Sequence, residues 1–226
     1  MSDVVVSTVS ILFFGIAYGM VLYLVSVGLS VTMGLMGFVN LAHGVFAAAG
    51  GYVATSLMNR LGLPFLPAVL GGVVAAMMLS VPLERLLYRR LYGGDELDQV
   101  LLTIGLAFMA VAAGKFIWGP LAQPFQPPDW LSGHIDVAGR QFPTFRSFVI
   151  VAGVALFAAL WLGLERTKFG AMIRAAVDNR RMAQSVGINT SELFTWTFAL
   201  GSGLAALGGS LGAEILAIEP AYALEH

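Results

Sequence analysis

The chain has 226 residues, of which 58% are hydrophobic and only 11% are charged, with a net charge of −1 and a mean hydropathy of +0.84. Soluble domains carry about 25% charged residues, so this composition excludes an ordinary soluble domain and indicates an integral membrane protein of the helical type. The small net charge offers no basic field for nucleic acid, and the absence of cysteine excludes disulfides and thiolate metal sites.

Apolar segments separated by charged or proline-containing stretches predict about six membrane spans. Residues 4–59 contain no Asp, Glu, Lys or Arg, and about 20 apolar residues already cross a bilayer. We therefore expect an all-α polytopic transmembrane bundle that forms a single domain over residues 1–226. The predicted segments, in chain order, are residues 6–33, 34–57, 61–83, 99–118, 147–164 and 193–218.

The second segment is interrupted by glycines and by the pair Asn40 and His43, within the stretch GLMGFVNLAHG at residues 34–44. Such residues in an apolar run predict a broken or re-entrant helix. At this spacing the two polar side chains share one helical face. With Gly37 and Gly44 they are candidates for a polar lining of the translocation pathway or, alternatively, for an interhelical hydrogen bond that fixes the break.

Two loops carry most of the positive charge. Residues 84–98 and 165–192 hold eight of the twelve Lys and Arg residues, which predicts that both loops are cytoplasmic. The proline-rich loop at 119–146, flanked by Trp118 and containing Trp130, suits the outer interface. Three crossings before the first basic loop place the N-terminus outside. If the second segment only dips into the membrane and returns, the N-terminus is inside instead.

The second basic loop, residues 165–192, predicts a short surface helix. Asp178 can cap its N-terminus, and Gly187 can end it in the left-handed conformation. The spacing alone favours an amphipathic connector with a solvated basic face. The alternative is a docking element for a cytoplasmic partner.

Small residues recur at helical spacing in the first and sixth segments, and in lipid they let helices approach closely. We expect them to pack within the chain; a dimer interface is the alternative. The sets are Gly15 with Gly19, Gly201 with Ala205 and Gly209, and Gly208 with Gly212.

No motif for catalysis is visible in the sequence. It contains no phosphate-binding loop, dinucleotide fingerprint, serine elbow or zinc-protease helix. His43 is not expected to bind metal, because no ligand spacing recurs around it. We therefore expect that the chain is not an enzyme and binds no cofactor or metal of its own.

Two stretches resemble the permease subunits of branched-chain amino-acid ABC transporters. Residues 34–44 are similar to the N-terminal signature of these subunits, Gly-x-x-Gly-x-x-Asn-Phe/Leu-Ala-His-Gly, and residues 174–189 to their cytoplasmic coupling loop. The order and spacing of the segments agree over essentially the whole chain. ABC importers generally carry the motif Glu-Ala-Ala-x-x-x-Gly at this loop, and here only Ala183 and Gly187 match it. The resemblance implies ATPase-coupling residues at Arg174, Ala175, Ala176, Asp178, Asn179, Met182, Ala183 and Gly187.

The resemblance implies a permease subunit of an ATP-driven importer, a multi-pass protein of the bacterial inner membrane. Its solute would be leucine, isoleucine, valine or a related small polar molecule. Its partners would be a second permease subunit, two cytoplasmic ATP-binding subunits that use the ATP, and a periplasmic solute-binding protein. Members of the family run on for roughly two further spans, so we expect this chain to be truncated at its C-terminal end.

A self-contained secondary transporter or channel is the alternative function. It would use the broken second segment as its filter. Such a protein is expected to carry acidic residues inside the membrane, and this chain has none away from the ends of its predicted segments.

Overall fold

The computed structural model describes residues 2–37, 40–92, 94–137 and 140–222. Phe38 and Val39 of the glycine-containing signature, and the last residues of the chain from 223 to 226, lie outside the described residues. The long helices of the described part are α1 (Ser2–Met36), α2 (His43–Leu61), α3 (Phe65–Leu86), α4 (Glu96–Trp118), α5 (Thr144–Arg166) and α8 (Thr190–Gly212).

Short elements connect the long helices. On one side they are η1 (Tyr88–Leu91), α6 (Lys168–Asp178) and α7 (Arg180–Ser185), and on the other side η2 (Asp129–Leu131), β1 (His134–Val137) and β2 (Arg140–Pro143). The two strands pair antiparallel in a small hairpin, with His134 opposite Pro143. The predicted all-α bundle is therefore confirmed, with the hairpin as a minor addition outside the helices.

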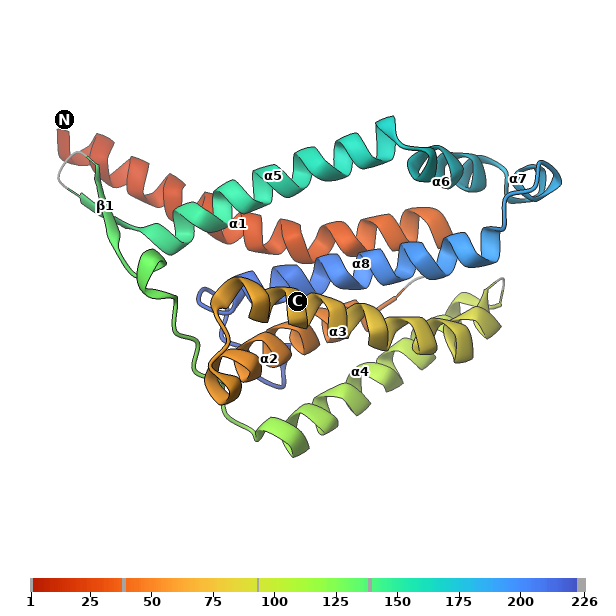
Figure 1. Ribbon diagram of the computed structural model, residues 1–226, viewed down its shortest axis with the longest axis horizontal. Helices are drawn as coiled ribbons and strands as arrows, with labels where there is room; N and C mark the ends of the chain where they lie inside the picture. The colour runs from red at the N-terminus through yellow and green to blue at the C-terminus, as the bar shows by residue number, and fades with distance from the viewer. Residues whose placement is uncertain (1, 38–39, 93, 138–139, 223–226) are drawn as a thin grey trace.

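Four helices in the described part are long and apolar enough to cross a membrane, namely α1, α3, α4 and α5. The remaining long helices, α2 and α8, are the more enclosed ones: α1, α2 and α3 all pack against α8, so that α8 lies at the centre of the bundle (Figure 1). Most residues of α8 and about half of those of α2 are buried within the bundle, so these two helices expose little surface to lipid. Together these helices correspond to the predicted segments.

Small residues let the backbones of the central helices touch. A Cβ atom placed on Gly28 of α1 would collide with the carbonyl oxygen of Gly201, and one placed on Gly209 with that of Ala47 in α2. The predicted packing of the sixth segment within the chain is thus confirmed. It is wrong for Gly15 and Gly19, where an added Cβ would meet nothing in the described structure, because both glycines lie on the exposed side of α1 while Ala17 between them is buried.

The sides of the bundle follow from the contacts of α1. Phe13, in its N-terminal part, packs against Phe142 of the hairpin with ring centroids 4.8 Å apart, whereas its C-terminal part lies near α6. Figure 1 shows the N-terminus beside β1 and the helices α6 and α7 at the opposite end. The N-terminus and the basic loop thus lie at opposite ends of the bundle; together with the positive-inside rule, this arrangement keeps the prediction of an N-terminus outside.

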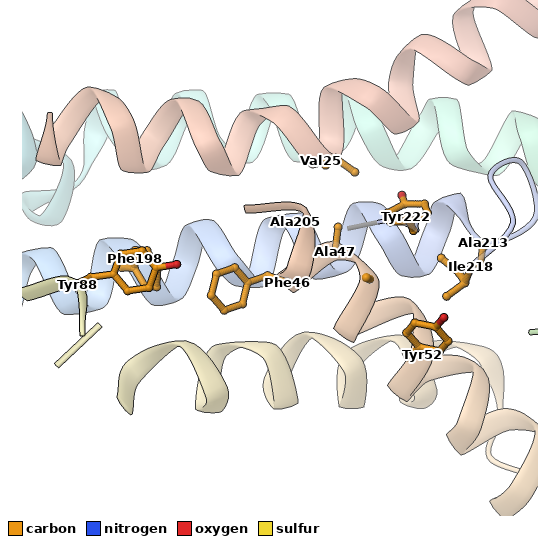
Figure 2. Packing of buried hydrophobic residues seen from close by; sticks show 11 residues of the cluster. Val25, Phe46, Ala47, Tyr52, Tyr88, Phe198, Ala205, Ala213, Ile218 and Tyr222 are labelled. Atoms are coloured by element: carbon orange, nitrogen blue, oxygen red, sulfur yellow. The ribbon is translucent and has the colours of Figure 1, made fainter. Parts of the chain in front are cut away.

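The hydrophobic core follows α8 from end to end. Figure 2 shows one buried cluster that runs from Tyr88 and Phe198 to Ala213 and Ile218. The sixth segment was predicted to continue to residue 218, but α8 ends at Gly212. Beyond Gly212, the backbone of Ile218 forms an antiparallel bridge with Gln123 of the outer loop. The residues around Ile218 are therefore extended and not helical.

Candidate functional site

The break in the second segment lies between the end of α1 at Met36 and the start of α2 at His43. Gly37 adopts a φ of 58°, and its N–H donates to the carbonyl of Met33 at 2.9 Å, which closes the last turn of α1. A glycine is favoured at such a helix end because residues with a Cβ are strained at positive φ. The predicted broken helix is therefore confirmed.

Helix α2 begins inside the bundle and runs to the outer side. At its start, the His43 ring lies against the carbonyl of Val25, in the middle of α1. At its far end, Trp118 donates to Ser56 at 2.7 Å and Asn59 donates to the carbonyl of Pro124 in the outer loop at 2.9 Å. Helix α2 thus leads from the interior of the bundle to the outer loop and does not return to the end of α1.

Asn40 is 3% exposed and makes the turn that precedes α2. Its Oδ1 accepts hydrogen bonds from the backbone N–H of Ala42 at 3.1 Å and from the hydroxyl of Tyr88 at 3.2 Å. Its Nδ2 is buried without a hydrogen-bond partner among the described residues. An asparagine that bonds a backbone N–H two residues on favours a turn over a helix.

His43 is 4% exposed, and its Nε2 lies 3.1 Å from the carbonyl oxygen of Val25. Because a carbonyl only accepts, Nε2 carries the proton of this bond. Gly44 follows it, buried in the first turn of α2. The predicted common helical face of Asn40 and His43 is wrong, because Asn40 precedes the helix: its side chain bonds toward η1 and that of His43 toward α1.

The second basic loop folds into α6 and α7. Asn179 caps α7, since its Oδ1 accepts from the backbone N–H of Met182 at 3.0 Å. The predicted cap at Asp178 is wrong, because that residue still belongs to the last turn of α6, whereas Asn179 is extended, as a capping residue must be. Gly187 has a φ of 89° and ends this region, as predicted.

The residues predicted for ATPase coupling divide into a buried and an exposed set. Ala176 and Ala183 are buried against the start of α8, in a cluster with Leu193 and Phe194. The others are exposed, and they are Arg174, Ala175, Asp178, Asn179, Met182 and Gly187. Ala183 thus holds α7 on the bundle and does not itself form the outer surface of the loop.

An exposed apolar patch lies on the outer surface of α6 and α7. Met182 is 61% exposed and Val186 is 71% exposed, and their spacing of four residues puts them on the same side. Val177 at the end of α6 is also exposed, whereas Met172 lines a small pocket against α8 with Leu193 and Trp196. Large exposed apolar side chains outside the spans of a membrane protein indicate an interaction surface. The sequence analysis missed Val177 and Val186. The available signal was the presence of these large apolar residues in a basic loop that was predicted to be solvated.

A buried polar cluster at the cytoplasmic end of α3, which we call the Glu84 cluster, was also missed. Glu84 is fully buried and accepts from the hydroxyl of Thr195 at 2.7 Å and of Tyr92 at 2.9 Å. The Nε of Arg89 lies 3.7 Å from the same carboxylate, and the Arg89 guanidinium also donates to the carbonyl of Ser191. The pKa of Tyr92 is raised, mainly by burial and secondly by the negative charge of Glu84, so its hydroxyl stays protonated and can donate.

An apolar pocket of about 250 Å³ opens between α1, α3, α5 and α8. Its walls include Val73, Met77, Leu160 and Leu204, and no charged residue lines it among those described. A zwitterionic solute needs polar partners on burial. This pocket therefore fits a hydrocarbon surface and not an amino acid.

The family model and the similar proteins all point to the same family. The family model described as the permease component of a branched-chain amino acid transport system matches residues 11–223. The high-affinity branched-chain amino acid transport system permease protein BraD of Pseudomonas aeruginosa is 25% identical over 87% of this chain and 68% of its own length. The corresponding protein LivH of Escherichia coli is 24% identical over 88% of this chain and 68% of its own length.

An archaeal relative matches as well. The probable branched-chain amino acid transport permease protein LivH of Methanocaldococcus jannaschii is 29% identical over 91% of this chain and 66% of its own length. The chain thus spans about two thirds of the length of these relatives. No solved structure shows a significant match. Because the family model covers almost the whole sequence, the chain belongs to the family of permease components of branched-chain amino acid transport systems, and it is a membrane-spanning translocation protein of the cytoplasmic membrane.

Proposed function

We propose that the chain is the permease subunit of an ATP-driven importer for leucine, isoleucine, valine or a related small polar solute. The names of the relatives support this class of solute. The observation that carries the proposal is the exposed apolar patch on α6 and α7, outside the spans and on the side of the basic loops. A self-contained transporter has no need of such a surface, whereas an importer whose ATPases are separate proteins requires one.

The loop at residues 165–192 suits a coupling role because it is packed firmly against the bundle. Arg180 lies over the ring of Phe194 at 4.7 Å, and Arg174 donates to the carbonyl of Leu164 at the end of α5. The buried cluster around Ala183 fixes α7 on the first turns of α8. A force applied to the patch is therefore transmitted to α5 and α8 and is not absorbed by a loose loop.

The partners in this proposal are a second permease subunit, two cytoplasmic ATP-binding subunits and a periplasmic solute-binding protein. The ATP-binding subunits cover the patch and hydrolyse the ATP, so the permease itself needs no cofactor. The solute-binding protein approaches the outer loop, where Leu121 and Trp130 expose apolar side chains. Such exposed groups, flanked by prolines, are typical of a contact surface.

Transport proceeds in this proposal by alternating access. Closure of the ATP-binding subunits displaces α6 and α7, and the central helix α8 follows because it continues directly from α7. Since α8 packs against α1, α2 and α3, its displacement opens the bundle to one side at a time. Asn40 and His43 fix the break between α1 and α2 in this cycle, a role that their hydrogen bonds within the chain support.

Proteoliposomes test the proposed function. The chain is reconstituted with its candidate permease and ATP-binding partners, and uptake of labelled leucine is measured in the presence of the solute-binding protein. We expect uptake to require ATP on the side of the ATP-binding subunits and to resist collapse of ion gradients by ionophores. Uptake that persists without those subunits and stops when an ion gradient is collapsed would show a secondary transporter instead.

A further inference from the structure

A continuous series of contacts leads from α7 to the end of α3. Arg180 lies over the ring of Phe194, and Phe194 meets the ring of Tyr92 edge-on with centroids 5.8 Å apart. The hydroxyl of Tyr92 then donates to Glu84 at 2.9 Å. Each step joins a different element, so the series links the coupling helices, α8, the residues after η1 and α3.

The Glu84 cluster holds these elements together. A fully buried carboxylate is tolerated only while its hydrogen bonds and its ion pair remain in place. Its partners come from α8, through Thr195, and from the segment after α3, through Arg89 and Tyr92. The first turns of α8 and the end of α3 are therefore expected to move together.

Tyr88 extends this unit to the start of α2. It is buried one turn after Glu84, and its ring packs on Phe198 with centroids 4.9 Å apart (Figure 2). Its hydroxyl donates to Oδ1 of Asn40 at 3.2 Å, and the same oxygen accepts the N–H of Ala42. The hydroxyl of Tyr88 thus binds Oδ1 of Asn40, the same atom that holds the turn before α2.

We propose that Tyr88 is a positioning residue of the transport cycle, which transfers the displacement of α7 and α8 to the start of α2 inside the membrane. The inference rests on the proposed importer function. Spatial continuity alone does not establish coupling, so the test measures movement at both ends of the series. Tyr88→Phe is the informative variant, because it removes only the hydroxyl and keeps the ring on Phe198.

Spin labels report the movement, since the chain contains no cysteine of its own. Cysteines replace Leu41, beside the break, or Val186, on the patch, each paired with a second label at Phe116 on the outer end of α4. All three side chains are exposed. In the full complex, ATP is expected to change both distances. In Tyr88→Phe the change at Val186 is expected to remain, while the change at Leu41 becomes smaller.

Transport gives the second readout. The solute taken up per ATP hydrolysed is expected to fall about fivefold in Tyr88→Phe, as the loss of one hydrogen bond in the cycle implies. Tyr52→Phe is the matched control, because the Tyr52 hydroxyl is buried without a hydrogen-bond partner among the described residues and lies far from the break. Tyr92→Phe, which loosens the series at its other end, should act in the same direction as Tyr88→Phe.

The outcomes separate the inference from the function on which it rests. If ATP changes neither distance in the unmodified complex, both fail. If Val186 responds but Leu41 does not, or if Tyr88→Phe matches Tyr52→Phe in both readouts, the importer function stands and the role of Tyr88 is wrong. A drop in thermal stability of Tyr88→Phe, with normal uptake per ATP, would also overturn the inference, because it would show a purely structural hydroxyl.

Discussion

The turn before α2 and the helices α6 and α7 of the basic loop contain the two stretches that resemble the permease family, and they are built in opposite ways. In the first region, Asn40 and His43 are buried; Oδ1 of Asn40 accepts from Tyr88 and from the backbone of Ala42, and Nε2 of His43 bonds the carbonyl of Val25. In the second, the backbone is fixed by a buried cluster while Met182 and Val186 remain exposed. We propose from this difference that one stretch of the family signature serves the structure of the break, and that the other serves contacts with a partner.

The largest effect is expected from charge on the patch. We expect Met182→Asp combined with Val186→Asp to lower ATP-dependent uptake by about 100-fold, because truncation of central apolar contacts in an interface costs about 2–4 kcal/mol. Thermal unfolding of the purified chain should be unchanged, since both side chains are exposed. Val186→Thr, which keeps the shape, is the control. Normal uptake in the double variant would remove the basis for docking at α6 and α7.

A large effect on stability, and not on turnover, is expected at the break. His43→Ala removes a buried hydrogen bond to the carbonyl of Val25, which keeps its helical hydrogen bond, and it also removes the buried imidazole ring; the loss costs about 1–3 kcal/mol. The unfolding temperature in detergent should fall, whereas the uptake rate per folded complex should stay normal. If turnover falls and the unfolding temperature does not, His43 contacts the solute, and the contrast between the two regions is wrong.

A smaller effect is expected where α7 ends. Gly187→Leu places a side chain at a φ of 89°, at a cost of about 1–2 kcal/mol, and should reduce coupling by about tenfold. Gly187→Asn is the matched control, since asparagine tolerates this conformation best among residues with a side chain. Uptake per ATP hydrolysed in both variants checks the expectation. Equal values for leucine and asparagine would show that the backbone conformation at this position does not matter.

The smallest effect tests the cap of α7. Asn179→Ala removes the acceptor for the N–H of Met182, which costs about 1 kcal/mol of local stability. Asp178→Ala, one residue away in the last turn of α6, should have almost no effect. Hydrogen exchange at the amide of Met182 measures the difference, and faster exchange in Asp178→Ala than in Asn179→Ala would contradict the assignment of the cap.

Much of the fold could be predicted from the sequence because lipid imposes a simple rule on helices. Apolar length located the six segments, and the stretch at residues 34–44 located the break. The wrong predictions concern helix ends, where a side chain can either continue the helix or bond the backbone as a turn or cap. Asn40 bonds a backbone N–H two residues ahead and so stays outside α2, and Asn179 takes the capping role that the carboxylate of Asp178 was expected to fill.

The candidate site was less predictable, because it depends on contacts between distant parts of the chain. Glu84 bonds Thr195, and Tyr88 bonds Asn40, across separations that no local pattern reports. The patch at Met182 and Val186 depends on which side of α7 faces the bundle. That orientation is set by the packing of Ala183 on α8, which sequence spacing alone does not specify.

The most direct test of the contrast between the two regions is the affinity of the ATP-binding subunits for the permease complex in nanodiscs, measured for Val186→Asp and His43→Ala beside the unmodified chain. We expect Val186→Asp to weaken binding at least about tenfold and His43→Ala to leave it unchanged. Weaker binding in His43→Ala together with normal binding in Val186→Asp would contradict the assignment of docking to the loop and of structure to the break.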